Sequence, residues 1–256
     1  MWKVQFDLTN PSPISLDFVI NDISVWINEN LAQINADNVQ AVNQNAASSK
    51  ALYAATCCLN YICWKYDVVL NINPLRLGID EIDPTRKIVG QAGYGSVDAK
   101  TMVHSSRVQS PISISGKKSD AAHYYRKGCL SNDSFDQFRN LYSAVEIISH
   151  KIYKKQPDEP GKIELDRALL KCFDDKVQFL YEVAKVIPTY NSQETTISEV
   201  VRILYKANLC ELNHHKTRVD NTAPPVALQD EMELMDALPL LKFVAKSLLG
   251  YEESSP

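Results

Sequence analysis

A segment near the carboxyl terminus, Thr196 to Asp220, places side chains capable of acid–base chemistry where a structural helix would carry apolar ones. Three polar residues, Asn208, Glu211 and His215, fall within its apolar stripe, and His214 lies beside them. Burying an unpartnered amide or carboxylate costs about 1–3 kcal/mol, so we expect these groups to have partners. The pattern predicts a functional site or a polar interface. The stripe itself is formed by Ile197, Val200, Val201, Leu204 and Leu212.

Two kinds of chemistry are open to these residues. Glu211 and His215 are four positions apart and share a helix face, but two ligands do not make a metal site, so we predict no metal and no cofactor. The alternative is a hydrogen-bonded polar layer between helices or between subunits, for which Arg139 and Glu146 on a facing helix are the natural partners. The other histidines stand alone and are interpreted as surface or core residues: His104, His123 and His150.

The composition excludes several classes of protein. The net charge is −4 over 256 residues, and the acidic excess is shared by both sides of Gly116, so neither half is a basic nucleic-acid module in bulk. The six cysteines show no C-x-x-C spacing and are interpreted as buried thiols of a reducing cytoplasm. The first residues alternate between apolar and polar side chains, unlike the continuous apolar segment of a signal peptide. No apolar segment reaches the roughly 20 residues that a membrane span needs. We therefore expect a cytoplasmic protein without a membrane partner.

Residues 1–115 have mostly the two-residue period of strands. Two alternating runs, 2–8 and 14–20, flank a proline-containing segment and predict a hairpin, and residues 44–66 have the wide apolar face of a helix. The glycine cluster at 90–95 lacks the spacing of a phosphate-binding loop and is interpreted as a hairpin turn. The first domain is therefore predicted to be a small antiparallel sheet with one main helix. Further strands are expected at 68–72, 75–79, 87–91 and 100–108.

Residues 116–256 change to a period of 3.6, which predicts an all-α bundle and an α+β protein overall. A capping sequence at Ser131 to Ser134 precedes the strongest helical stripe. Pro188 closes the helix expected before it, and Pro239 is expected to bend the last one. The predicted helices cover 117–129, 135–152, 163–187, 196–220 and 227–249.

The segments FRNLYSAVEIISHKIY and ILYKANLCELNHHKTR, together with the order of the helices, resemble the HEPN superfamily, most closely its methylamine-utilisation protein J and ApeA-like branches. The resemblance covers Lys117 to Leu249. It implies a homodimer formed through these helices and, in active members, a metal-independent endoribonuclease with an Arg and a His roughly four to six residues apart. It further implies RNA or a nucleotide as partner and a role in defence.

The chain lacks the arginine that active members of the family use for catalysis. The positions where the family's Arg would precede His214 or His215 hold Ala207, Asn208, Leu209 and Cys210. The resemblance implies that His214 or His215 is the general acid or base and that Glu146 orients it. Asn208 is neutral, so it could only weakly replace the cation that stabilises the phosphate. The cationic role would then pass to other residues. The remaining candidates for binding are Glu211, Arg139, Lys206 and Arg218.

Two hypotheses follow from the sequence. One is an RNA- or nucleotide-binding protein, a degenerate endoribonuclease of defence or toxin type. The other is a non-catalytic dimeric interaction module, in which the polar layer sets the register of the dimer and residues 1–115 bind a ligand or protein partner. The missing Arg favours the second.

Overall fold

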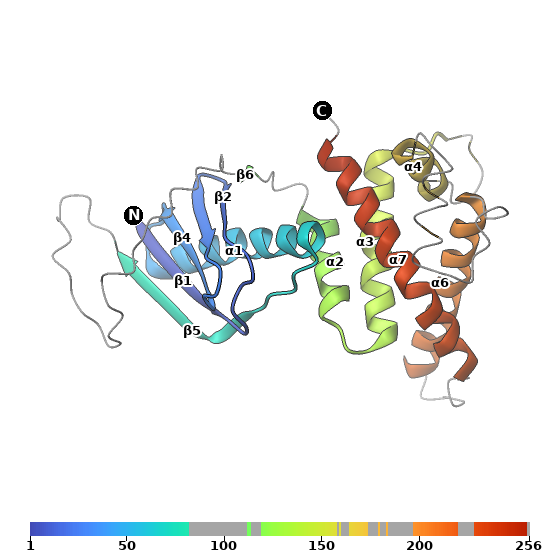
Figure 1. Ribbon diagram of the computed structural model, residues 1–256, viewed down its shortest axis with the longest axis horizontal. Coiled ribbons are helices and arrows are strands. Elements are labelled where there is room, and N and C mark those ends of the chain that lie inside the picture. The colour runs from blue at the N-terminus through green and yellow to red at the C-terminus, as the bar shows by residue number, and fades with distance from the viewer. Residues whose placement is uncertain are drawn as a thin grey trace. The chain divides into compact units, whose positions relative to one another are not determined.

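A computed structural model describes residues 1–81, 112–113, 119–157, 159, 164–173, 179, 183, 197–219 and 228–254 (Figure 1). The chain divides into two compact units. The sheet unit comprises Met1–Leu59 and Leu70–Gly116, and the helical unit comprises Asn60–Val69 and Lys117–Pro256. The predicted α+β class is confirmed, with a mainly antiparallel sheet and one helix followed by several helices.

The sheet unit has six strands in the order β5-β1-β4-β3-β2-β6. All neighbouring pairs are antiparallel except β2 and β6, which are parallel. Alternate residues are buried along β1, β2 and β3, because successive side chains of a strand point to opposite faces. The strands are β1 Trp2–Leu8, β2 Leu16–Ile20, β3 Ile23–Ile27, β4 Gln33–Val39, β5 Ile72–Glu81 and β6 Ile112–Ser113.

The predicted hairpin of residues 2–8 and 14–20 is wrong, because β1 and β2 are not neighbours. The segment between them crosses the sheet end, where the N–H of Ser12 donates to the carbonyl of Leu31 over 3.0 Å and Asn30 donates back to Ser12. The true hairpin joins β2 to β3 through Asn21 and Asp22, whose φ values of 50° and 66° give the turn the twist of the strands.

Three strands, β3, β4 and β6, were not predicted, and β5 is one continuous strand where two were expected. Residues 68–71, expected to begin a strand, lie outside any strand. The predicted strands at 87–91 and 100–108 and the glycine cluster at 90–95 lie outside the described residues.

The main helix of the sheet unit begins as the sequence predicts. Helix α1, Gln44–Tyr66, starts where the side chain of Asn43 accepts the N–H of Ala46 over 2.9 Å. Its part within the sheet unit lies along one face of the sheet (Figure 1). One side of that part is fully buried and consists of small residues: Ala47, Ala51, Ala54, Ala55 and Cys58.

The helical unit is organised around α3, which packs against α2, α4, α6 and α7. These helices are α2 Ser119–Leu130, α3 Ser134–Ile152, α4 Glu164–Cys172, α6 Ile197–Val219 and α7 Leu228–Ser254, the last of which continues through Pro239. No helix in the described ranges is apolar over a length that would cross a membrane.

Two helix ends differ clearly from the prediction. Helix α7 continues past the predicted end at 249 to Ser254. The sequence pattern indicated a helix from 163 to 187, but α4 ends at Cys172 and Phe173 follows it outside the helix; of the rest of that range only Phe179 and Val183 are described, and both are helical. The ring of Phe173 lies 4.6 Å from that of Phe179 and 6.4 Å from that of Phe243 on α7, measured between centroids. These tertiary aromatic contacts accompany the departure from the local helical pattern.

Helices α2 and α3 approach closely at a glycine. A Cβ added to Gly128 would lie 2.6 Å from Cγ of Leu141 and 3.1 Å from the carbonyl oxygen of Gln137. Only a residue without a side chain therefore fits at this position without moving α3.

Candidate functional site

The candidate site is built on α3, whose start is fixed by Asp133. The carboxylate of Asp133 accepts the N–H groups of Phe135 and Asp136 over 3.0 and 2.9 Å, which satisfies two donors at the helix start. The buried face of α3 then turns Tyr142, Glu146 and His150, each four residues apart, to a common flank. The buried face itself includes Phe135, Phe138, Leu141, Val145 and Ile148.

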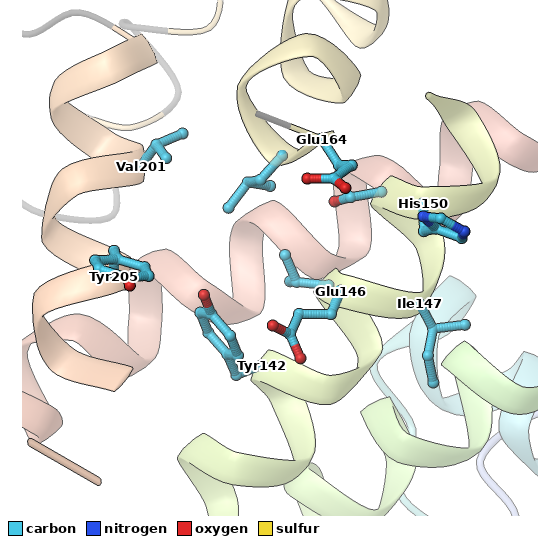
Figure 2. Close-up of a pocket in the computed structure, with 10 residues that line it drawn as sticks. Tyr142, Glu146, Ile147, His150, Glu164, Val201 and Tyr205 are labelled. Carbon is cyan, nitrogen blue, oxygen red and sulfur yellow. The ribbon is translucent and has the colours of Figure 1, made fainter. Parts of the chain in front are cut away.

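This flank forms one wall of a cavity of about 380 Å³ within the helical unit. Helices α4 and α6 form the other walls (Figure 2). A cavity of this size accommodates a small organic molecule or a long side chain of a partner. Its lining residues are Tyr142, Val145, Glu146, Ile147, Ser149, His150, Glu164, Leu165, Val201 and Tyr205.

Two carboxylates dominate the charge of the cavity. Glu146 comes from α3 and Glu164 from the first turn of α4, and no Lys or Arg is among the described residues that line the space. Anionic ligands are therefore disfavoured here, and positively charged groups are favoured.

The phenol of Tyr142 is held neutral at the centre of this wall. Burial, followed by the neighbouring Glu146 and Tyr205, raises the pKa of Tyr142 above its ordinary value. Its hydroxyl points toward the space between Tyr205 and Glu146 (Figure 2). Tyr142 therefore remains a hydrogen-bond donor at neutral pH, next to an aromatic ring and a carboxylate.

Ser149 adds a polar group that the protein leaves unpartnered. Its side chain is 1% exposed, lines the cavity, and its Oγ has no hydrogen-bond partner among the described residues. A buried hydroxyl without a partner is costly, and a ligand in the cavity could supply the missing bond.

The residues predicted from the sequence are distributed over two helices. Asn208 is buried on α6 with 8% exposure, and Lys206 is exposed on the same helix. Arg139 on α3 bonds Asp136 of its own helix over 3.1 Å, while Glu146 lines the cavity together with Tyr205 of α6, three residues before Asn208. The helical backbone of α6 includes the other four, whose side chains are outside the described part of the chain: Glu211, His214, His215 and Arg218.

Most of the cavity was missed by sequence reasoning. His150 was interpreted as an isolated histidine, and Tyr142, Glu164 and Tyr205 were given no role in a site. The four-residue spacing of Tyr142, Glu146 and His150 was a usable signal, because it places a phenol, a carboxylate and an imidazole on one flank. The contribution of α4 and α6 depends on tertiary packing.

The described residues contain no group of three His, Cys, Asp or Glu side chains placed to hold a metal ion. Glu146, His150 and Glu164 thus line one space without converging on a common point. The chemistry that the described cavity offers is recognition by charge, hydrogen bonding and aromatic contact.

No protein-family model, curated protein or solved structure matches the chain.

Proposed function

We propose that the helical unit is a non-catalytic binding module that recognises a positively charged group attached to an apolar or aromatic portion, such as an amine or guanidinium ligand. The observation that carries this proposal is that Glu146 and Glu164 both line a cavity whose other walls are largely apolar and aromatic. Carboxylates and tyrosine rings both attract cations; Glu146 and Tyr205 are exposed and Glu164 is half-buried, so a ligand can reach all three from solvent.

The ligand is anchored by distinct groups in this proposal. Its cation is shared by Glu146 and Glu164, its apolar part contacts Val145, Val201 or the ring of Tyr205, and the Ser149 hydroxyl bonds a polar atom of the ligand. This corresponds to the interaction-module hypothesis, with the helical unit rather than residues 1–115 holding the ligand.

The test uses benzylamine and its neutral analogue benzyl alcohol with the full chain, measured by calorimetry. We expect benzylamine to bind, benzyl alcohol to bind at least about tenfold more weakly, and Glu146→Gln or Glu164→Gln to weaken benzylamine by about tenfold, since a hydrogen bond to a charged group contributes about 1.5–3 kcal/mol. Glu199→Gln is the matched control, because Glu199 lies on α6 paired with Arg202 and does not line the cavity. Equal binding of both probes, or an equal effect of the control, would reject the proposal.

The endoribonuclease prediction is tested separately. A phosphate at the cavity would face two carboxylates, so RNA chemistry would have to use the carboxyl-terminal part of α6, which carries His214 and His215. Incubation of the protein with mixed RNA in EDTA, beside the His214→Ala, His215→Ala double variant, distinguishes the two hypotheses. Fragments with cyclic phosphate ends that depend on these histidines would establish the nuclease.

The homodimer and the cytoplasmic location remain predictions. Light scattering at micromolar concentration measures the oligomeric state directly, and a monomer would remove the proposed role of the polar layer in dimer register.

A further inference from the structure

The two carboxylates of the cavity in the helical unit come from different walls. Glu146 belongs to α3 and Glu164 to the first turn of α4, and the two side chains lie apart in the view of Figure 2. Neither Lys nor Arg is among the described residues that line the space. The cavity therefore offers two negative charges at two separate places.

A ligand with a single positive charge compensates only part of this charge. When both carboxylates are ionised and one ammonium group is bound, the cavity keeps a net negative charge of one. Like charges that line the same space also repel each other, and a second cation removes the excess charge and weakens this repulsion. The charge of the lining therefore favours a ligand with two cationic groups.

The rest of the lining suits the hydrocarbon chain that would join two such groups. Val145, Leu165 and Val201 line the cavity, and their side chains offer no hydrogen-bonding atoms. Contact with these side chains removes methylene groups from water, which is favourable. The volume of about 380 Å³ accommodates a short aliphatic molecule with a polar group at each end.

Ser149 indicates which kind of cationic group fits. Its side chain is 1% exposed and lines the cavity, and its Oγ has no hydrogen-bond partner in the described part of the chain. A primary ammonium group has three N–H donors, so it can bond a carboxylate and the Ser149 oxygen at the same time. A quaternary ammonium group has no N–H and would leave this hydroxyl unpartnered.

We propose that the preferred ligand of the cavity is an aliphatic primary diamine, with one ammonium group at Glu146, the other at Glu164, and an N–H bond from one of them to Ser149. The proposal rests on the function proposed above, because it names the class of cation that the same site takes. It assigns a separate cation to each carboxylate. Both amino groups of such a diamine are protonated at neutral pH, as the amino group of a lysine side chain is.

The test compares 1,5-diaminopentane with hexylamine by calorimetry on the full chain at pH 7 and low ionic strength. The two molecules have the same number of non-hydrogen atoms, and they differ in whether the second end is an ammonium or a methyl group. We expect the diamine to bind at least about tenfold more tightly than hexylamine, and this advantage to shrink at high salt.

The carboxylates are tested by the ratio of the two affinities within each variant. In Glu146→Gln and in Glu164→Gln the diamine should bind less than about threefold more tightly than hexylamine, because only one carboxylate remains. Glu199→Gln is the matched control and should keep the ratio of the parent, since Glu199 pairs with Arg202 and does not line the cavity. A ratio of affinities is insensitive to a partial loss of folded protein.

The role of Ser149 is tested with the same diamine methylated fully at both nitrogens, which keeps both charges and has no N–H. We expect the parent to prefer the primary diamine by at least about fivefold, and this preference to fall by about threefold or more in Ser149→Ala. An unchanged preference in that variant would overturn the bond to Ser149.

The outcomes separate this proposal from the function on which it rests. If hexylamine and benzylamine bind and the diamine binds no more tightly, the diamine class is wrong and the binding of amines stands. If none of these amines binds, both proposals are rejected. An unchanged ratio in both glutamate variants would also overturn the diamine. The same holds if N-acetyl-lysine methylamide, which has one charge and represents a lysine of a protein partner, binds more tightly than the diamine.

Discussion

Both units bury polar side chains, but they differ in charge: the sheet unit buries Ser12 and Asn35, which are 1% and 2% exposed, whereas the buried arginine of the described residues lies in the helical unit. Arg126, Ser149 and Asn208 are all less than 9% exposed there. Burial raises the pKa of Cys58 in the sheet unit, and the helical unit contains a larger set of shifted groups: Cys63, Cys129 and Tyr142. Buried polar groups cost stability unless they are hydrogen-bonded or paired, and shifted pKa values are frequent at functional sites, so the helical unit is the part of the described chain in which we look for a site first.

The largest expected effect tests this contrast with one phenylalanine from each unit. Phe138→Ala and Phe18→Ala remove rings that are 0% and 1% exposed, and each should lower the free energy of unfolding by about 3–5 kcal/mol. The ring of Phe138 stacks on that of Tyr142 at 5.8 Å between centroids, so this variant should also lose benzylamine binding. Chemical denaturation and calorimetry check both results. If folded Phe18→Ala also lost benzylamine binding, the binding site could not be assigned to the helical unit alone.

An intermediate effect is expected from glycines within the helical unit. Gly128→Ala should lower the free energy of unfolding by about 1–3 kcal/mol, because its Cβ would meet Leu141 at 2.6 Å. Gly250→Ala on α7 is the matched control, since nothing lies within 4 Å of the added Cβ, and it should stabilise the protein by about 0.5–1 kcal/mol. The denaturant concentration at the midpoint of unfolding measures the stability of each variant. If Gly128→Ala and Gly250→Ala both raise or both lower this midpoint, the proposed close packing of α2 against α3 is contradicted.

The smallest effect concerns pH. Burial, followed by Lys127 and Arg126, lowers the pKa of His123, while Asp120 partly opposes them. Below about pH 6.5 the unfolded chain binds a proton at this position that the folded chain resists, so stability should fall as pH falls. Melting temperatures at pH 8 and pH 5.5 should therefore differ less for His123→Gln than for the parent. If the difference in melting temperature between the two pH values is the same in His123→Gln as in the parent, protonation of His123 does not cause the loss of stability at acidic pH.

The sequence predicted elements well where local periodicity agrees with tertiary packing. Helix α1 was placed with its observed bounds, and Ser131 to Ser134 correctly marked the start of α3. Strand partners could not be obtained in this way, because the proline segment after β1 looks like a turn but pairs with residues near Leu31. Periodicity assigns a residue to a face, and it does not identify which element covers that face.

The same limit applies to the candidate site. The sequence drew attention to Glu146, but as a partner of Asn208, because both were assigned to facing helices. Tyr205 and Glu164 join Glu146 only when α6 and α4 pack against α3.

The interior position of β1, between β5 and β4, has a consequence for the order of folding. Its two neighbours are β4, which ends at Val39, and β5, which ends at Glu81. Trp2 therefore pairs with Val39 on one side and with Glu81, far along the chain, on the other. During synthesis the sheet cannot close around its first strand until Glu81 has left the ribosome, whereas α2 and α3 are adjacent in sequence and can pair at once. We expect β1 to pair first with β4 and to keep its other edge unpaired until β5 has been synthesised.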